Sequence, residues 1–97
     1  MTTIDAFRES VTGISPPDGV RPALQGLWWV AKDDWDRAHK VIQEHGGQPG
    51  CDLVHAHLHR VEGDLSNAGY WCSRAGRPAA TNSLEDEWRA VAAELLR

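Results

Sequence analysis

The histidines are the residues of this chain best suited to chemistry. All five lie between positions 39 and 59, and three of them alternate in the string HAHLH. On a helix, His55 and His59 share one face, whereas His57 points elsewhere. Glu62 extends the shared face by a further turn. Two histidines at i and i+4 with a nearby carboxylate form a zinc-ligand pattern, so His55, His59 and Glu62 are candidate metal ligands.

The spacing of these histidines also occurs in zinc metalloproteases, which carry a glutamate directly after the first histidine. That position is Ala56 here, so the catalytic base is missing and a protease is excluded. A structural role is the alternative to metal binding, because a His59–Glu62 pair three residues apart supports a helix by itself. We favour the structural role at this stage, and we expect no cofactor and no catalytic residue.

His39 and Gln43 form a second pair at i and i+4, on the helical segment that precedes HAHLH. If the two helices pack together, this pair converges with His55 and His59. The result would be a polar pocket whose neutral imidazoles exchange protons near pH 7. In the alternative, the two pairs face different sides or satisfy each other in a buried network. The alternative is favoured.

A third group adds two aromatic and two cationic side chains, namely Arg60, Tyr70, Trp71 and Arg74. Tyr70 and Arg74 lie at i and i+4, and an arginine beside an aromatic ring makes a cation–π contact or clamps an anion. The plainer interpretation is a solvated helix face. The complete candidate pocket consists of His39, Gln43, His55, His59, Arg60, Glu62, Tyr70 and Arg74.

Helical patterns surround these candidates along the whole chain. Apolar residues recur at helical spacing, glycines and prolines separate the segments, and no segment alternates as a strand does. The sequence therefore predicts one all-α domain over residues 1–97, with five or six short helices. Its predicted units are an N-terminal helix at 3–12, a hairpin at 22–46, a hairpin at 52–76 and a C-terminal helix at 83–97.

The two hairpins align with each other when the chain is shifted by 30 residues. The matched pairs are Gly26 with Ala56, Asp34 with Asp64, and Ala38 with Ala68. A small residue on the first helix, an Asp at the turn and an Ala on the second helix resemble the tetratricopeptide (TPR) repeat. The period departs from the usual value of about 34 residues. The resemblance implies two TPR-like hairpins with flanking capping helices.

A second resemblance covers residues 34–76. The string HAHLHRVEGDLSNAGYWCSRAG, with DWDRAHKVIQ upstream, resembles an HAxLHRxEGDxxNAxYWYxRAG motif of short uncharacterised bacterial and fungal proteins. Cys72 departs from it, since tyrosine is usual there. This resemblance implies a shared small helical fold and brings no activity with it.

Charge and hydropathy exclude two classes of partner. The net charge of -4 is spread evenly along the 97 residues, so the sequence contains no basic cluster for a nucleic acid, and a local arginine patch formed on folding is the alternative. No apolar run approaches the roughly 20 residues that span a membrane, and the first residues lack the pattern of a signal peptide. A cytoplasmic location is therefore expected. Cys51 and Cys72 lie in no CxxC spacing, which favours free thiols and leaves a disulfide as the alternative.

Five tryptophans are many for so short a chain. Helical spacing predicts that Trp28 and Trp35 enter the core of the first hairpin, and that Trp71 and Trp88 do so further along. Trp29 points away from Trp28 by about 100° on a helix, which makes it the candidate for an interface.

The favoured function is therefore a non-catalytic scaffold that binds itself, as a homodimer, or another protein. The alternative is a small-molecule- or metal-binding protein, or an enzyme, that uses the candidate pocket. A scaffold predicts dispersed histidines and a large apolar contact. A binding site predicts histidines within hydrogen-bond reach of one another in a concave pocket.

Overall fold

The computed structural model describes residues 3–48 and 50–97 of the chain. The described residues form helices and no strand, which confirms the predicted all-α class. None of these helices is long and apolar enough to cross a membrane. In chain order the elements are α1 (Ile4–Glu9), a 3-10 turn η1 (Ser10–Thr12), α2 (Pro22–Ala31), α3 (Trp35–Glu44), α4 (Cys51–Val61), α5 (Leu65–Arg74) and α6 (Leu84–Leu95).

The starts of the helices follow from residues that can cap them. Asp34 accepts a hydrogen bond from a backbone N–H in the first turn of α3, and Asp64 does the same for α5. Helix α4 begins one residue before position 52, where the second hairpin was predicted to begin. Its N-cap is Gly50, whose φ of 86° is rarely adopted by other residues, so the helix begins at Cys51.

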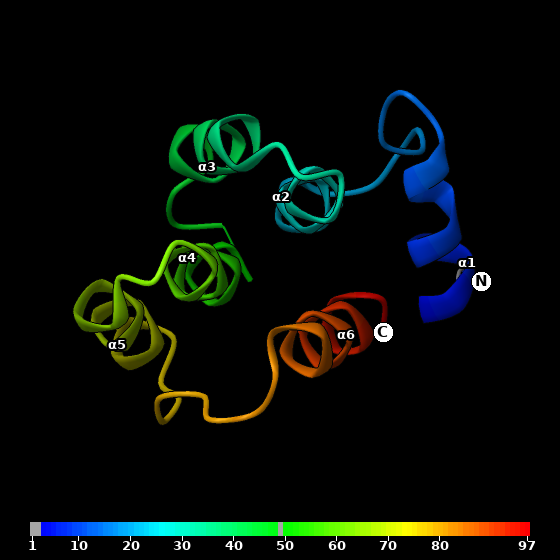
Figure 1. The fold of residues 1–97 in the computed structure, drawn as a ribbon. Coiled ribbons are helices and arrows are strands. Elements are labelled where there is room, and N and C mark those ends of the chain that lie inside the picture. The colour runs from blue at the N-terminus through cyan, green and yellow to red at the C-terminus, as the bar shows by residue number, and fades with distance from the viewer. Residues whose placement is uncertain (1–2, 49) are drawn as a thin grey trace.

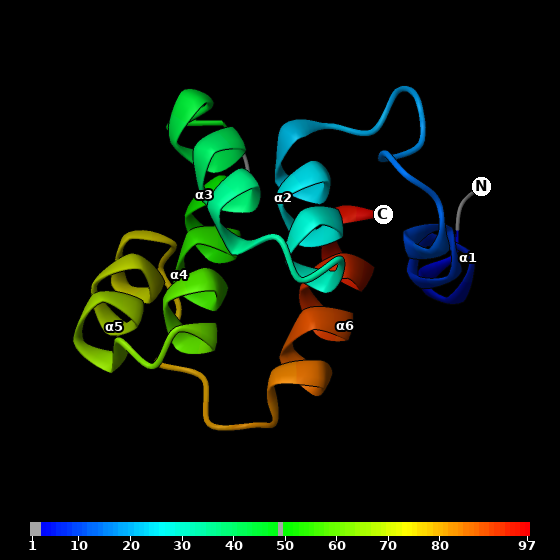
Figure 2. The ribbon, with the colours of Figure 1, turned by 45° about the horizontal axis from the view of Figure 1, so that its top comes forward.

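Helix α4 occupies the centre of the structure. It contacts α2, α3, α5 and α6, whereas α5 packs against α4 at one edge (Figure 1). The short turns between α2 and α3 and between α4 and α5 place each pair side by side (Figure 2). Helix α1 crosses the other helices at the opposite edge. Any side chains that meet between α3, α4 and α5 therefore lie on the far side of the molecule from α1.

Two of the five tryptophans anchor the core, as the sequence predicted. Trp28 and Trp88 are almost completely buried. The Trp88 indole N–H donates to the Leu27 carbonyl at 2.8 Å, and its ring stacks on Phe7 at a centroid distance of 5.7 Å. These contacts join α1, α2 and α6. Trp35 and Trp71 are only half-buried, and each stacks on a histidine.

Both cysteines are buried free thiols, so the predicted thiol state is the observed one. Burial is the main factor that raises the pKa of Cys51, and the neighbouring Asp52 raises it further. Cys51 is therefore a neutral thiol at neutral pH.

Gly26 lies where α2 packs closely against the helices that carry the histidines. A Cβ added there would lie 2.6 Å from Ile42 Cδ1 and 3.2 Å from Val54 Cγ1. We expect Gly26→Ala to lower the free energy of unfolding by about 1–3 kcal/mol, because Ile42 is buried and must move. Urea unfolding measures the change.

The matched control is Gly69→Ala on α5, where an added Cβ meets nothing within 4 Å. That variant should be unchanged or more stable by up to about 1 kcal/mol, because alanine is the better helix former. Equal stability of the two variants would show that α2 does not pack against α3 and α4 as closely as described.

Candidate metal centre

His39 reaches the interior because of how α3 begins. The Asp34 cap sets the first turn, so Trp35 and His39 follow on one face at i and i+4. The Trp35 indole N–H donates to the Leu58 carbonyl at 2.7 Å, which fastens α3 to α4. The Trp35 ring also stacks on the His39 ring at a centroid distance of 4.7 Å. His39 is thus held against α4.

His55 and His59 lie one turn apart on α4 and face α3. Both are buried, with 6% of each residue exposed. Glu62 lies just after the end of α4, where its carboxylate accepts a hydrogen bond from Nδ1 of His59 at 2.6 Å. This bond places the proton of His59 on Nδ1, which leaves Nε2 with its lone pair.

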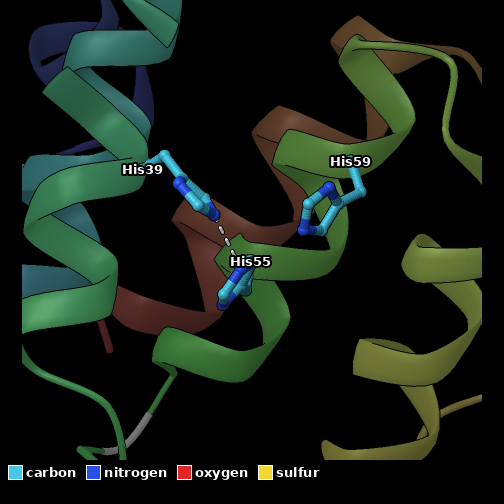
Figure 3. A group of neighbouring side chains, drawn as sticks. All are labelled: His39, His55 and His59. Atoms are coloured by element: carbon cyan, nitrogen blue, oxygen red, sulfur yellow. Dashed lines mark hydrogen bonds between the residues drawn. The ribbon is translucent and has the colours of Figure 1, made fainter. Parts of the chain in front are cut away.

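The three imidazoles come together between α3 and α4. His39 Nε2 and His55 Nε2 form a hydrogen bond at 3.1 Å, and the His59 side chain lies beside this pair (Figure 3). One ring nitrogen from each histidine lies within 4.8 Å of the other two. The structure thus realises the convergence that sequence reasoning had not favoured. The third member of the cluster is His39, whereas the candidate set from the sequence was His55, His59 and Glu62. Glu62 instead forms a hydrogen bond with His59.

The cluster favours the uncharged forms of His39 and His55. Burial, and then the proximity of His39 and His59, lowers the pKa of His55 to about 4. Burial also lowers the pKa of His39, and His59 adds to this, while Glu62 and Asp36 partly offset it. In the His39–His55 hydrogen bond one Nε2 donates its proton and the other accepts it, so this pair is able to relay a proton, and it is able to bind a metal ion when the ion replaces the shared proton.

Trp35 and Trp71, which were both predicted for the core, form walls of this cluster, and Trp35 also packs against the core. Trp71 of α5 stacks on His55 with ring centroids 3.8 Å apart and planes 12° from parallel. Trp35 covers His39 from the other side. The contact between Trp35 and His39 was predictable from the sequence, because the two residues lie at i and i+4 on one helix. The Trp71–His55 contact joins two helices and had no local signal.

An open pocket of about 230 Å³ adjoins the histidine cluster. His55 and Trp71 belong to its lining, and so does Gln43, the exposed partner of His39 in the predicted pair. The other lining residues are Ile42, Gly46, Cys51 and Asp52. The cluster is therefore connected to a concave surface between α3, α4 and α5.

Three predicted pocket residues lie elsewhere. Arg60 turns towards α6, where it forms an ion pair with Glu87 at 3.0 Å. Tyr70 and Arg74 are exposed on α5, and the Arg74 guanidinium lies over the outer Trp71 ring at 5.2 Å. These side chains do not enter the histidine cluster, because they lie on other faces of α4 and α5.

Trp29, the interface candidate, is half-buried at the end of α2. Its ring packs edge-on against Trp28, and the Arg37 guanidinium covers it at 4.4 Å from the centroid. Contacts within the chain therefore account for much of its surface.

A buried ion-pair network separates the histidines of α4 into two sets. His57 points away from the cluster, and its Nδ1 lies 2.7 Å from Glu87 Oε1 of α6. Burial raises the pKa of Glu87, but hydrogen bonds and charge from His57 and Arg60 outweigh this and hold it below its ordinary value. This network joins α4 to α6 and was missed by sequence reasoning.

The sequence and the structure were compared with known proteins, and these comparisons suggest no function for the site. No protein-family model matches the chain, and neither the curated proteins nor the solved structures contain a significant match.

Proposed function

We propose that the protein binds a divalent transition-metal ion through His39, His55 and His59. The observation that carries this proposal is the approach of one nitrogen from each of these three rings to within 4.8 Å. Zinc–nitrogen bonds of about 2.0–2.1 Å place the nitrogens of a tetrahedral site about 3.3 Å apart. The His39–His55 pair already matches at 3.1 Å, and a bound ion would replace the hydrogen bond between these two nitrogens and draw the His59 nitrogen closer.

The ligand types select the class of metal. Imidazole suits zinc, copper, nickel and cobalt, whereas magnesium and calcium require oxygen ligands. The Glu62 carboxylate on His59 Nδ1 is also the partner that a metal-binding histidine usually has, because it fixes the tautomer and orients the ring. Zinc is the ion that we expect to fit best, since it has no geometric preference of its own.

The test is a zinc titration of chelator-treated protein, followed by calorimetry. We expect one zinc ion per chain, and no binding of magnesium or calcium. Alanine at His39, His55 or His59 should weaken zinc binding by more than the roughly 10- to 100-fold that the loss of an outer partner costs. His39→Ala is the first variant to make, because His39 is the least buried of the three.

His45→Ala is the control. His45 donates from Nδ1 to the Val41 carbonyl at 2.9 Å and lies outside the cluster, so this variant should bind zinc as the wild type does. Circular dichroism verifies that each variant is folded. Zinc binding that survives in a folded His39→Ala variant, or that is absent in the wild type, would refute the proposal.

The interaction protein favoured by the sequence is the second proposal. Leu65 and Tyr70 on the outer helix α5 support it, because 70% and 54% of these residues are exposed. Dispersed histidines were the pattern expected of a scaffold. The clustering of three histidines therefore favours the metal-binding protein over the scaffold.

A further inference from the structure

The histidine cluster supplies three ligands from protein side chains. Among the described residues, the group formed by His39, His55 and His59 contains no fourth histidine, cysteine, aspartate or glutamate. Structural zinc sites use four protein ligands, whereas sites that exchange ligands or perform catalysis use three and keep one position open. A metal ion held here would therefore have an open coordination position.

The open pocket borders the histidine cluster at His55, so a fourth ligand is able to approach the cluster from this side. His55 lines both the cluster and the pocket of about 230 Å³, and Trp71 lies along both. This volume is below the roughly 300–1,000 Å³ of pockets that hold drug-sized molecules. The pocket therefore suits a ligand the size of a single ring or a short chain.

The pocket walls define the chemistry of such a ligand. Ile42 and Trp71 provide apolar surface for its body. The charge of Asp52 is partnered by Arg74, whose Nε lies 3.8 Å from a carboxylate oxygen. Three neutral imidazoles would leave the double positive charge of the ion uncompensated, so the open position favours an anionic oxygen donor. Gln43 lies on the pocket wall, and its side-chain amide N–H is able to donate a hydrogen bond to the anionic oxygen of the ligand.

We infer that this site binds a small monocarboxylate, with its carboxylate on the open metal position and its apolar body in the pocket between Ile42, Gln43 and Trp71. The inference rests on the proposed metal-binding function. Benzoate is the probe of choice, because its ring fits the apolar walls. Acetate has the same carboxylate but only a methyl group in place of the ring. The difference in affinity between benzoate and acetate therefore measures the contribution of the pocket.

The experiment uses protein loaded with Co²⁺, whose visible absorption bands respond to any change in coordination. Azide, acetate and benzoate are titrated separately. We expect all three to change the bands, with benzoate binding at least about tenfold more tightly than acetate, because its ring leaves water. Gln43→Glu should weaken benzoate binding, since it places a negative charge on the pocket wall. Gln48→Glu, the same change outside this pocket, should not.

The outcomes separate the two proposals. A missing cobalt spectrum would refute the metal site, and the ligand inference with it. Cobalt that binds with a spectrum insensitive to azide and benzoate would refute the ligand inference alone, because the coordination sphere would then be closed. Equal effects of Gln43→Glu and Gln48→Glu, or equal affinities for acetate and benzoate, would show that the carboxylate does not use this pocket.

Discussion

Replacing Glu87 with alanine is expected to lower the free energy of unfolding by about 3–5 kcal/mol, the usual cost of breaking a buried ion pair. His57 and Glu87 are 2% and 7% exposed. The Glu87 carboxylate accepts from His57 at 2.7 Å and pairs with Arg60 at 3.0 Å. Removal of this shared acceptor leaves the buried His57 Nδ1 without its partner and removes the charge partner of Arg60, which keeps its hydrogen bonds to Asn82. Chemical denaturation at pH 7 measures the loss.

Glu85→Ala on the same helix turn is the matched control. Glu85 pairs with Arg8 at 3.5 Å, but its side chain is 53% exposed, so its loss should cost at most about 1 kcal/mol. Similar losses for the two variants would contradict the assignment of Glu87 as the residue that joins α4 to α6.

The same carboxylate predicts a dependence on pH. The folded pKa of Glu87 lies below its ordinary value of 4.5, because the contributions of His57 and Arg60 exceed the opposing effect of burial. The unfolded state therefore binds the proton more readily. The contribution of Glu87 to stability is present above pH 4.5 and is lost as the pH falls through the folded pKa. A Glu87→Gln variant should accordingly lose less stability in acid than the wild type.

The local part of the site was predictable from the sequence, and the part that joins helices was not. The pairs His39–Gln43 and His55–His59 follow from helical spacing, and the caps Asp34 and Asp64 follow from the turn residues. Whether the pairs meet depends on the rotation of α3 against α4. No local pattern determines that rotation, since the bond between Trp35 and the Leu58 carbonyl that contributes to it spans 23 residues.

The same distinction explains the residues that were misplaced or missed. Arg60 follows the histidine motif directly, but it serves a partner 27 positions later on α6. Trp71 looked like a core residue, because burial and stacking on a histidine give the same apolar periodicity. The hairpin that contains α4 was predicted to begin at Asp52, a residue of a type that often caps helices. Gly50 takes that place because the chain enters the helix with a positive φ.

Zinc binding should raise the free energy of unfolding strongly, because the proposed site joins two helices of the fold. The ion would join α3 to α4 through His39 on one side and His55 and His59 on the other. Free zinc at 100 times its dissociation constant adds about 2.7 kcal/mol to the free energy of unfolding. For a domain of this size, the midpoint of thermal unfolding should rise by about 10–20 °C. Removal of zinc with a chelator should reverse the rise.

Glu62→Gln tests whether the Glu62 carboxylate, which accepts a hydrogen bond from His59, increases the stabilisation by zinc. The variant keeps all three ligands but loses the charged acceptor on Nδ1, so zinc affinity should fall about 10- to 100-fold. At the same free zinc concentration, the zinc-dependent gain then shrinks to about 0.4–1.4 kcal/mol. Comparing each variant with and without zinc cancels any direct effect of the substitution. Glu44→Gln at the exposed end of α3 should keep the full gain, and an equal gain in Glu62→Gln would mean that Glu62 does not orient a metal ligand.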